Sequence, residues 1–192
     1  MLNKELKFDR YEESFLWLKD AAVALPVYIA TEPVSPLVVS KETNIFKLFQ
    51  SDVGLLTSCY PAAVKKAILD MNPENEINNG ALFENFVAQE FYANELATYY
   101  YKTTKIGEVD FLIEVDGEVV PVEVKSGKGY KKHPALDKLL KVENYGLKNA
   151  IVLSTANIEK EGQITYLPVY MAYLIKPQET ENITLNLDLT GL

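Results

Sequence analysis

The sequence contains few of the side chains that most metal and nucleophile sites use. Its 192 residues include one cysteine, Cys59, and one histidine, His133. One cysteine excludes an internal disulfide and a cysteine-based zinc cluster, and one histidine excludes a zinc site with two histidine ligands. We expect His133 to lie on a solvent-facing loop over residues 131–134. Because Arg10 is the single arginine, bidentate recognition of phosphates or bases is nearly absent.

Long apolar runs and an excess of positive charge are also missing. No run of 18 apolar residues occurs, and the longest candidate, residues 21–30, is short and contains Pro26. The first ten residues lack the apolar core of a secretion signal. These absences predict a cytoplasmic protein that is neither secreted nor membrane-spanning. The net charge of −8, from 19 basic and 27 acidic residues, argues against tight non-specific DNA binding.

The chain does contain enough apolar material for a folded core. Apolar residues make up 48% of it, and its 192 residues exceed one typical domain of roughly 100–150 residues. We therefore expect one large or two small domains, with a boundary in the polar, turn-rich stretch 72–80. The predicted units are a module over residues 1–78, a domain over 79–176, and a polar tail or edge strand over 177–192.

Residues 1–78 predict short helices around one hairpin. The expected elements are helices over 10–25, 52–59 and 62–71 and strands over 27–30 and 44–49. Pro26 is expected to end the first helix, and Asp52 to cap the second. Helices with a hairpin suggest a small winged-helix-like α+β module. An irregular helical cap on the following domain is an alternative that the pattern leaves open.

Residues 79–176 predict an α/β domain with the element order αβββαβ and a mixed sheet. The expected elements are a helix over 81–96, strands over 98–103, 108–115 and 118–125, a helix over 134–145 and a strand over 149–154. Asp116 and Gly117 are the expected type I′ turn between the second and third strands. A last apolar segment follows over residues 167–175.

The second and third of these strands carry charged residues among apolar ones. Asp110 has apolar neighbours, and Glu123 and Lys125 alternate with valines. Because alternate residues of a strand share a face, Glu123 and Lys125 point to the same side, and the hairpin brings Asp110 next to Glu123. Two carboxylates that close repel each other, and a divalent cation resolves the conflict. The pattern predicts a Mg²⁺ or Mn²⁺ site held by Asp110 and Glu123.

This set of side chains suits metal-dependent hydrolysis of a phosphodiester bond. A metal held by two carboxylates activates a water molecule, and Lys125 beside it can orient that water and neutralise the developing charge. Glu84, in the first turns of the helix over 81–96, is a further acid. The predicted catalytic residues are thus Asp110, Glu123, Lys125 and Glu84. The alternative is a buried ion-pair network with no catalytic role.

The same residues resemble the motif of the PD-(D/E)XK nuclease superfamily. Asp110 matches its strand aspartate, residues 123–125 match its E-x-K, and Glu84 matches its helix glutamate. The resemblance implies a restriction-endonuclease-like αβββαβ core and a divalent-metal-dependent nuclease activity on DNA.

Over a longer stretch the chain resembles one particular group, the C-terminal domain of unknown function of bacterial and archaeal AAA-type ATPases. The segments that carry this resemblance are residues 46–56, 80–87, 108–113 and 121–127. It implies that an ATPase domain or chain is a partner. The sequence itself contains no G-x-x-x-x-G-K-[ST] phosphate loop, so we expect neither a bound nucleotide nor ATPase activity from it.

Lysines cluster directly after the E-x-K motif. Residues 125–141 contain six lysines and one aspartate, a local charge of +5 in an acidic chain. A basic patch of this kind can guide a nucleic-acid backbone towards a metal site. The predicted contacts are Lys128, Lys131, Lys132 and Lys138. An ordinary solvated face is the alternative.

Two hypotheses of function follow. The first is a Mg²⁺-dependent deoxyribonuclease domain. The second is a catalytically inactive nuclease-like module that binds DNA or a protein partner and regulates an ATPase. Closely placed carboxylates of Asp110 and Glu123 in an open groove favour the first hypothesis. Closure of the site by the tail, or by pairing of Lys125, favours the second.

Overall fold

A computed structural model of the protein describes residues 12–70 and 79–177. The helices are α1 (Glu12–Asp20), α2 (Val53–Ser58), α3 (Ala62–Leu69), α4 (Gly80–Ala93) and α5 (Pro134–Leu140). The strands are β1 (Ala24–Ala30), β2 (Lys41–Gln50), β3 (Thr98–Thr103), β4 (Gly107–Val115), β5 (Glu118–Val124), β6 (Ala150–Ser154), β7 (Glu159–Glu161) and β8 (Ile164–Pro168). Short 3₁₀ helices are η2 (Leu37–Ser40), η3 (Glu143–Tyr145) and η4 (Val169–Leu174).

The strands form one mixed sheet in the order β2-β1-β3-β4-β5-β6-β8-β7. The β1–β3, β5–β6 and β6–β8 pairs are parallel, and the remaining neighbours are antiparallel. The mixed α/β class and the predicted order αβββαβ, which is α4-β3-β4-β5-α5-β6, are confirmed. Asp116 and Gly117 both have positive φ, 56° and 75°, as the predicted type I′ turn between β4 and β5 requires.

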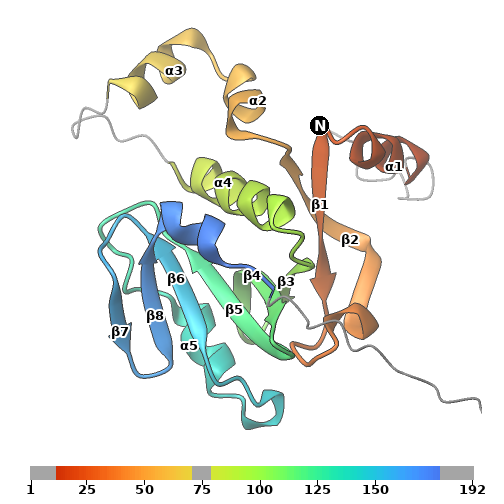
Figure 1. Ribbon diagram of the computed structural model, residues 1–192, viewed down its shortest axis with the longest axis vertical. Helices are drawn as coiled ribbons and strands as arrows, with labels where there is room; N and C mark the ends of the chain where they lie inside the picture. The colour runs from red at the N-terminus through yellow and green to blue at the C-terminus, as the bar shows by residue number, and fades with distance from the viewer. Residues whose placement is uncertain (1–11, 71–78, 178–192) are drawn as a thin grey trace, which may run out of the picture.

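Helices cover both faces of the sheet, with α4 on one side and α5 on the other (Figure 1). Each face buries its own apolar cluster. The α4 face includes Val87, Phe91, Phe111, Val122 and Val124, and the α5 face includes Val109, Leu112, Leu136, Leu139 and Val152. Strands buried on both faces carry few polar residues, so a buried charged side chain on β4 or β5 needs a specific partner.

The helix predicted over residues 10–25 is shorter than expected, and Pro26 does not end it. Ala22, just after α1, has a φ of 53°, which no helix continues through. Pro26 instead lies inside β1, where it pairs with β2. β1 pairs with β3 only at Tyr28 and Ile29. On its β3 side, the proline therefore lies at a free edge of β1, where its missing N–H breaks no ladder.

The hairpin of the predicted winged-helix-like module is part of the main sheet. β1 pairs with β3 and carries β2 to the outer edge, so the sheet spans the predicted boundary. Division of the chain at residue 78 stays a prediction. Residues 71–78, and the predicted tail or edge strand from residue 178 onwards, lie outside the described residues. In the described ranges, no helix has the length and apolar character needed to cross a membrane.

Two differences concern the last third of the chain. The helix predicted over 134–145 is divided into α5 and η3. The sequence analysis missed β7, which has the sequence EKE and no apolar alternation that could reveal a strand. This strand pairs with β8 at the edge opposite β2.

Candidate active site

A bulge in β4 sets the position of Asp110. The β3–β4 ladder shifts register between Tyr99, opposite Leu112, and Tyr101, opposite Val109. Two residues of β4, Asp110 and its neighbour, therefore lie opposite a single residue of β3. Bulges redirect side chains in this way. Because the residues on either side of this pair both pack on the α5 face, the bulge turns Asp110 towards α4.

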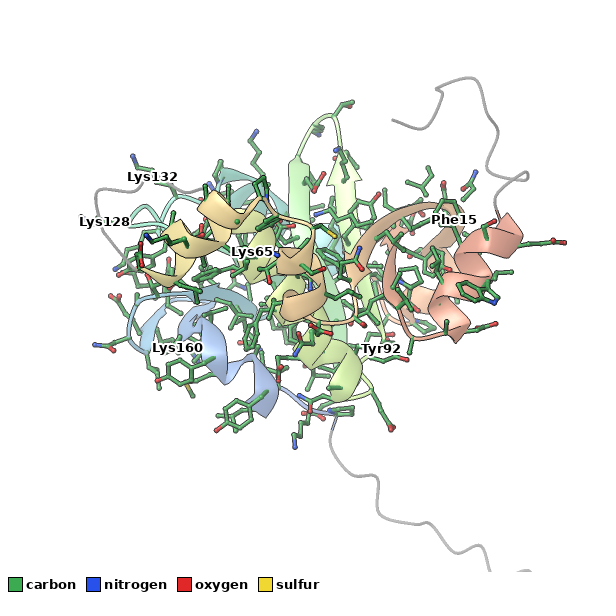
Figure 2. The ribbon with its side chains drawn as sticks, turned by 90° about the horizontal axis from the view of Figure 1, so that it is seen from above. Phe15, Lys65, Tyr92, Lys128, Lys132 and Lys160 are labelled. Atoms are coloured by element: carbon green, nitrogen blue, oxygen red, sulfur yellow. The ribbon has the colours of Figure 1, made fainter. Side chains whose placement is uncertain are left out.

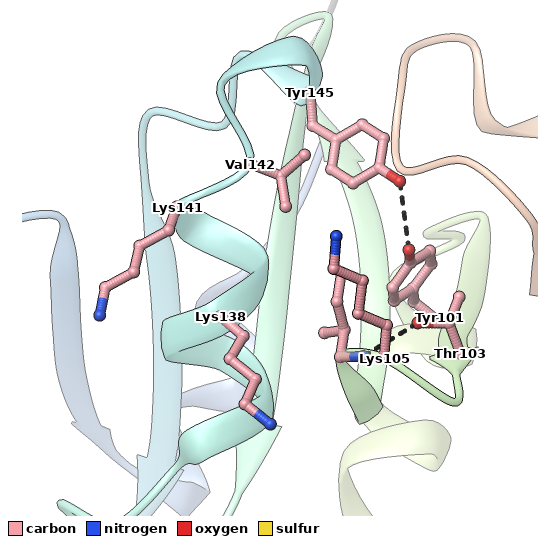
Figure 3. Close-up of a pocket in the computed structure, with 8 residues that line it drawn as sticks. Tyr101, Thr103, Lys105, Lys138, Lys141, Val142 and Tyr145 are labelled. Carbon is pink, nitrogen blue, oxygen red and sulfur yellow. Dashed lines mark hydrogen bonds between the residues drawn. The ribbon is translucent and has the colours of Figure 1, made fainter.

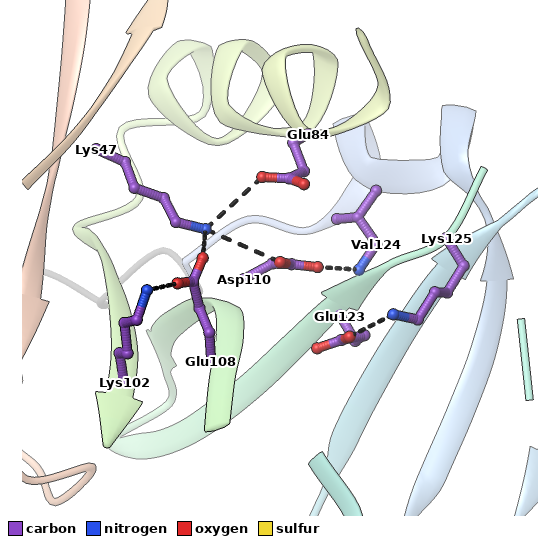
Figure 4. A network of polar contacts seen from close by, with 8 residues as sticks. All are labelled: Lys47, Glu84, Lys102, Glu108, Asp110, Glu123, Val124 and Lys125. Carbon is purple, nitrogen blue, oxygen red and sulfur yellow. Dashed lines mark hydrogen bonds and ion pairs between the residues drawn. The ribbon is translucent and has the colours of Figure 1, made fainter. Parts of the chain in front are cut away.

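Asp110 also lies where β4 and β5 separate. The β4–β5 pairs begin at the hairpin and reach Phe111 opposite Val122. Beyond that point β4 continues beside β3, and β5 continues beside β6. At this fork the Asp110 carboxylate replaces a strand partner, since its Oδ2 accepts the Val124 N–H at 2.8 Å (Figure 4). The fork thus holds an acid by main-chain hydrogen bonding.

Glu123 and Lys125 lie on the other arm of the fork, at the end of β5. Figure 4 shows both side chains on the side of β5 away from the Val124 side chain, as the predicted alternation requires. Lys125 Nζ donates to Glu123 Oε1 at 2.6 Å. The second carboxylate oxygen, Oε2, is buried and has no hydrogen-bond partner. With its side chain only 7% exposed, Glu123 is a buried carboxylate whose hydrogen bonding is half satisfied.

Both acids at the fork are destabilised in their charged form. Burial and the charge of Asp110 raise the pKa of Glu123 to about 7, against the opposing effects of Lys125 and of the Asp110 main-chain N–H. Burial likewise raises the pKa of Asp110, although the Val124 N–H, Lys47 and Lys125 favour its carboxylate. Desolvation with a like charge nearby is the usual origin of such shifts. The site has a surplus of negative charge in a poorly solvated position.

A second ionic cluster, which the sequence analysis missed, meets the first at Asp110. Lys47 of β2 places its Nζ 2.5 Å from Glu108 Oε1, 3.7 Å from Glu84 Oε2 and 3.9 Å from Asp110 Oδ1. Lys102 binds the other oxygen of Glu108 at 2.7 Å. We call these five residues the Lys47 cluster (Figure 4). The Lys47 ammonium group is thus the cation that lies among these three carboxylates.

The Lys47 cluster is electrostatically coupled from end to end. Burial alone would lower the pKa of Lys47, but Glu108, Asp110 and Glu84 together raise it. Burial and the Asp110 charge raise the pKa of Glu84. Glu108, despite its burial, has a lowered pKa because Lys102 and Lys47 both bind it. Asp110 therefore influences both Glu84 and Glu123, and it links the two clusters.

The placement of Glu84 depends on two neighbouring amides that dock α4 onto β2 and α2. The buried Asn85 accepts the Gln50 N–H at 2.8 Å and donates to the Gln50 carbonyl at 3.1 Å. Gln89 accepts the Val53 N–H at 3.1 Å. These contacts bring the first turns of α4 beside β2, which is why Glu84 meets Lys47. The structure thus brings together all four predicted catalytic residues within two touching clusters.

The residues at the fork fit a hard divalent cation. Within the described part of the chain, no group of three or more His, Cys, Asp or Glu side chains is arranged to hold a metal. Mg²⁺, however, commonly binds through one or two carboxylates and completes its shell with water and phosphate oxygens. The unpartnered Oε2 of Glu123 and the raised pKa of both Asp110 and Glu123 indicate acids that a cation would stabilise.

The four predicted nucleic-acid lysines differ in their surroundings. Lys128 and Lys132 are exposed in the segment between β5 and α5, at the same margin of the molecule (Figure 2). Lys131 instead binds Glu159 at 2.8 Å and Glu161 at 2.5 Å, on β7. Lys138 lies on α5 and lines a separate pocket. Lys128 and Lys132 form no ion pair with another residue in the described ranges.

His133 is buried, so the prediction that it faces solvent is wrong. It is 4% exposed, and its Nε2 lies 2.9 Å from the Tyr166 hydroxyl. Its Nδ1 lies 2.9 Å from Asp137 Oδ1, one turn along α5. The neighbouring lysines suggested a surface loop, but the hydrogen bond to Tyr166 compensates the burial of Nε2, whereas Nδ1 lies near the Asp137 carboxylate without a hydrogen bond. The arrangement fixes the start of α5.

Residues 79–171 match the family model described as a domain of unknown function (DUF4143). No curated protein and no solved structure matches the chain. The DUF4143 segment contains Glu84, Asp110, Glu123 and Lys125, whereas Lys47 comes from outside it. The Lys47 cluster therefore joins the DUF4143 segment to the strand that precedes it.

Proposed function

We propose that residues 79–176 form a PD-(D/E)XK-like domain that hydrolyses DNA phosphodiester bonds with Mg²⁺ or Mn²⁺. In this proposal the core is restriction-endonuclease-like, and the chain is the C-terminal region of a AAA-type ATPase family protein. The motif resemblance supports this proposal, and so do the order α4-β3-β4-β5-α5-β6 and the meeting of the motif residues at one fork.

The observation that carries the proposal is the half-satisfied carboxylate of Glu123 beside Asp110. A stable fold rarely leaves a carboxylate oxygen buried and unpartnered. Here burial and the Asp110 charge raise the pKa of Glu123 to about 7. Strongly perturbed acids next to one another are typical of functional sites. A divalent cation would supply the missing partner and relieve the repulsion.

Each residue has a defined role in this proposal. Asp110 and Glu123 hold the metal, which when bound supplies an activated water and a counter-charge for the phosphate. The Val124 N–H fixes the orientation of Asp110. Lys125 orients the attacking water and offsets charge on the phosphate. Glu84 acts through Lys47 and Asp110 to maintain the negative potential of the fork.

The direct test is cleavage of supercoiled, linear and branched DNA in Mg²⁺ or Mn²⁺. Asp110→Asn and Glu123→Gln keep the size of each side chain and remove its charge. Glu114→Gln, also on β4 but with no part in either cluster, is the matched control. We expect metal-dependent cutting by the wild type and the control and none by the two site variants. No cutting by a folded wild type in either metal would contradict the proposal.

A second function is favoured by the protein's own ammonium groups. Lys47 lies among Glu84, Glu108 and Asp110, and Lys125 is bound to Glu123. This pairing is what an inactive nuclease-like module would retain. We propose such a module as the alternative: it binds DNA or a protein partner and regulates an ATPase domain or chain. Binding of labelled branched DNA in EDTA, with no cleavage when metal is added, would favour it.

A further inference from the structure

The α5 face of the sheet has a pocket that neither proposed function uses. It has a volume of about 570 Å³ and lies between β3, the β3–β4 turn and α5. The residues that line it are Tyr101, Thr103, Lys105, Ile106, Lys138, Lys141, Val142 and Tyr145 (Figure 3). Its size lies within the usual range for small-molecule sites. None of the residues at the fork lines this pocket.

Apolar and aromatic groups form the base of the pocket. Ile106 is buried, and the rings of Tyr101 and Tyr145 meet at 73° with their centroids 6.2 Å apart. Their hydroxyls lie 3.2 Å apart in a hydrogen bond. Together with Val142, these rings give a surface suited to a flat, largely apolar ring system. The base of the pocket can therefore pack against a planar ring.

Cationic groups lie at the open side of the pocket. Figure 3 shows Lys105 and Lys138 extending into the space between α5 and the β3–β4 turn, whereas Lys141 points away from it. Both Lys105 and Lys138 are exposed, and in the described ranges neither forms an ion pair. In a chain of net charge −8, two unpaired ammonium groups beside an apolar base match a dianion better than a monoanion.

The tyrosine pair does not oppose an anion. Burial, followed by the hydrogen bond to Tyr145, raises the pKa of Tyr101 to about 12. Its hydroxyl is therefore neutral at physiological pH. Since one hydroxyl of a bonded pair keeps a free hydrogen, Tyr101 or Tyr145 can donate to an acceptor on a ligand. The pocket thus offers two cations, one donor and an apolar base.

We propose that this pocket binds a nucleoside phosphate, with the base ring against Tyr145 and Val142 and the phosphate between Lys105 and Lys138. A free nucleotide and the 5′-phosphorylated end of a nucleic-acid strand share this chemistry. The proposal is independent of the nuclease proposal, because it uses none of the residues at the fork.

Calorimetric titration with adenosine 5′-monophosphate, adenosine and inorganic phosphate tests the proposal. We expect the monophosphate to bind more tightly than either fragment by about tenfold or more, because only it fills both parts of the pocket. Lys105→Ala and Lys138→Ala should each weaken its binding by about tenfold, the usual effect of losing one charge-assisted contact. Lys160→Ala, an exposed lysine of β7, is the matched control and should leave affinity unchanged.

Two further measurements are needed. The first distinguishes a free nucleotide from a strand end, and the second distinguishes failure of this proposal from failure of the nuclease proposal. Displacement of the monophosphate by 5′-phosphorylated hexathymidylate, but not by its unphosphorylated form, would identify a strand end. Failure of both oligonucleotides to displace it would identify a free nucleotide. Asp110→Asn should bind the monophosphate as the wild type does, whatever happens to cleavage. The proposal would be overturned if the wild type showed no saturable binding of the monophosphate. It would also be overturned if the Lys105→Ala and Lys138→Ala variants bound the monophosphate as tightly as the wild type.

Discussion

The two ionic clusters that meet at Asp110 differ in how far the chain neutralises them. In the Lys47 cluster every acid lies within ion-pair distance of an ammonium group, and Glu108 binds two of them. At the end of β5, Glu123 has one ammonium partner and one buried oxygen without any. The pKa of Glu108 is lowered, whereas that of Glu123 is raised to about 7.

This difference separates a structural role from a functional one. Ion pairs that compensate their own burial anchor β2 and α4 to the fork and need nothing further. An acid held in its disfavoured charged form has a free-energy cost that folding alone does not recover. Such a cost is expected where a ligand completes the site. We therefore regard the Lys47 cluster as the frame of the site and Glu123 as its reactive position.

Replacement of Lys125 should give the largest effect on activity. We expect Lys125→Ala to reduce metal-dependent DNA cleavage by at least about a hundredfold, the usual contribution of a group that handles a proton or charge in the transition state. Stability should change little, because Glu123 can take up a proton when it loses its partner. Cleavage rates and urea unfolding of the same preparation measure both. Undiminished cleavage would mean that the E-x-K assignment is wrong.

Replacement of Glu123 should show the cost of its charge directly. The carboxyl binds its proton more tightly in the folded state, so the wild type loses stability as pH rises from about 4.5 through about 7. Glu123→Gln should therefore be more stable than the wild type at pH 8, by at most about 3 kcal/mol, and equal to it near pH 4. Urea unfolding at both pH values measures this difference.

The same variant also separates metal binding from simple charge repulsion. Mn²⁺ should raise the melting temperature of the wild type and leave that of Glu123→Gln unchanged, since a ligand that binds the folded state stabilises it. Glu114→Gln serves as the control both for the pH dependence of stability and for the effect of Mn²⁺ on the melting temperature. If the stability difference between the wild type and Glu123→Gln is the same at pH 4 and pH 8, the charge of Glu123 has no cost, and the contrast drawn between the two clusters is wrong.

Replacement of Lys47 should destabilise the frame. Lys47→Met leaves Glu84 and Asp110 without their nearest cation, and we expect a loss of about 2 kcal/mol at pH 7, within the range for a half-buried pair. Because the pKa of Glu108 is lowered in the folded state, the stabilisation that Glu108 contributes is fully present above about pH 4.5 and is lost as the pH falls below that value. Urea unfolding at pH 7 and pH 4 tests the size and the sign.

Lys47→Met also tests whether its ammonium group competes with a metal. If it does, Mn²⁺ should raise the melting temperature of the variant more than that of the wild type. An unchanged stability together with unchanged Mn²⁺ binding would show that the cluster is not a frame for the site. Both outcomes are read from thermal unfolding with and without metal.

Local sequence patterns were enough to predict the arms of the fork. The alternation of Glu123 and Lys125 with valines and the Asp116–Gly117 turn fix strand faces and pairing within a short span, so those predictions needed no distant contact. Glu108 was missed although its spacing from Asp110 was a usable signal. The bulge at Asp110 leaves no mark in local periodicity.

Lys47 and His133 could not be predicted in the same way, because each depends on distant pairing. Lys47 reaches the fork because β1 joins β3 in parallel and carries β2 with it. His133 is buried because Tyr166 of β8 meets its ring. Contacts between segments this far apart are set by the assembled sheet. The residues next to His133 in the sequence are lysines, and they predicted an exposed position instead.

The smallest predicted effect comes from Lys102, which binds the same carboxylate as Lys47. Its side chain is 60% exposed, against 21% for Lys47. Water screens an exposed pair and replaces its partner when it is broken, so exposed ion pairs add little to stability. We expect Lys102→Met to leave the urea midpoint and the cleavage rate unchanged within error. A loss as large as that of Lys47→Met would show that Glu108, and not the buried position of Lys47, determines the strength of the frame.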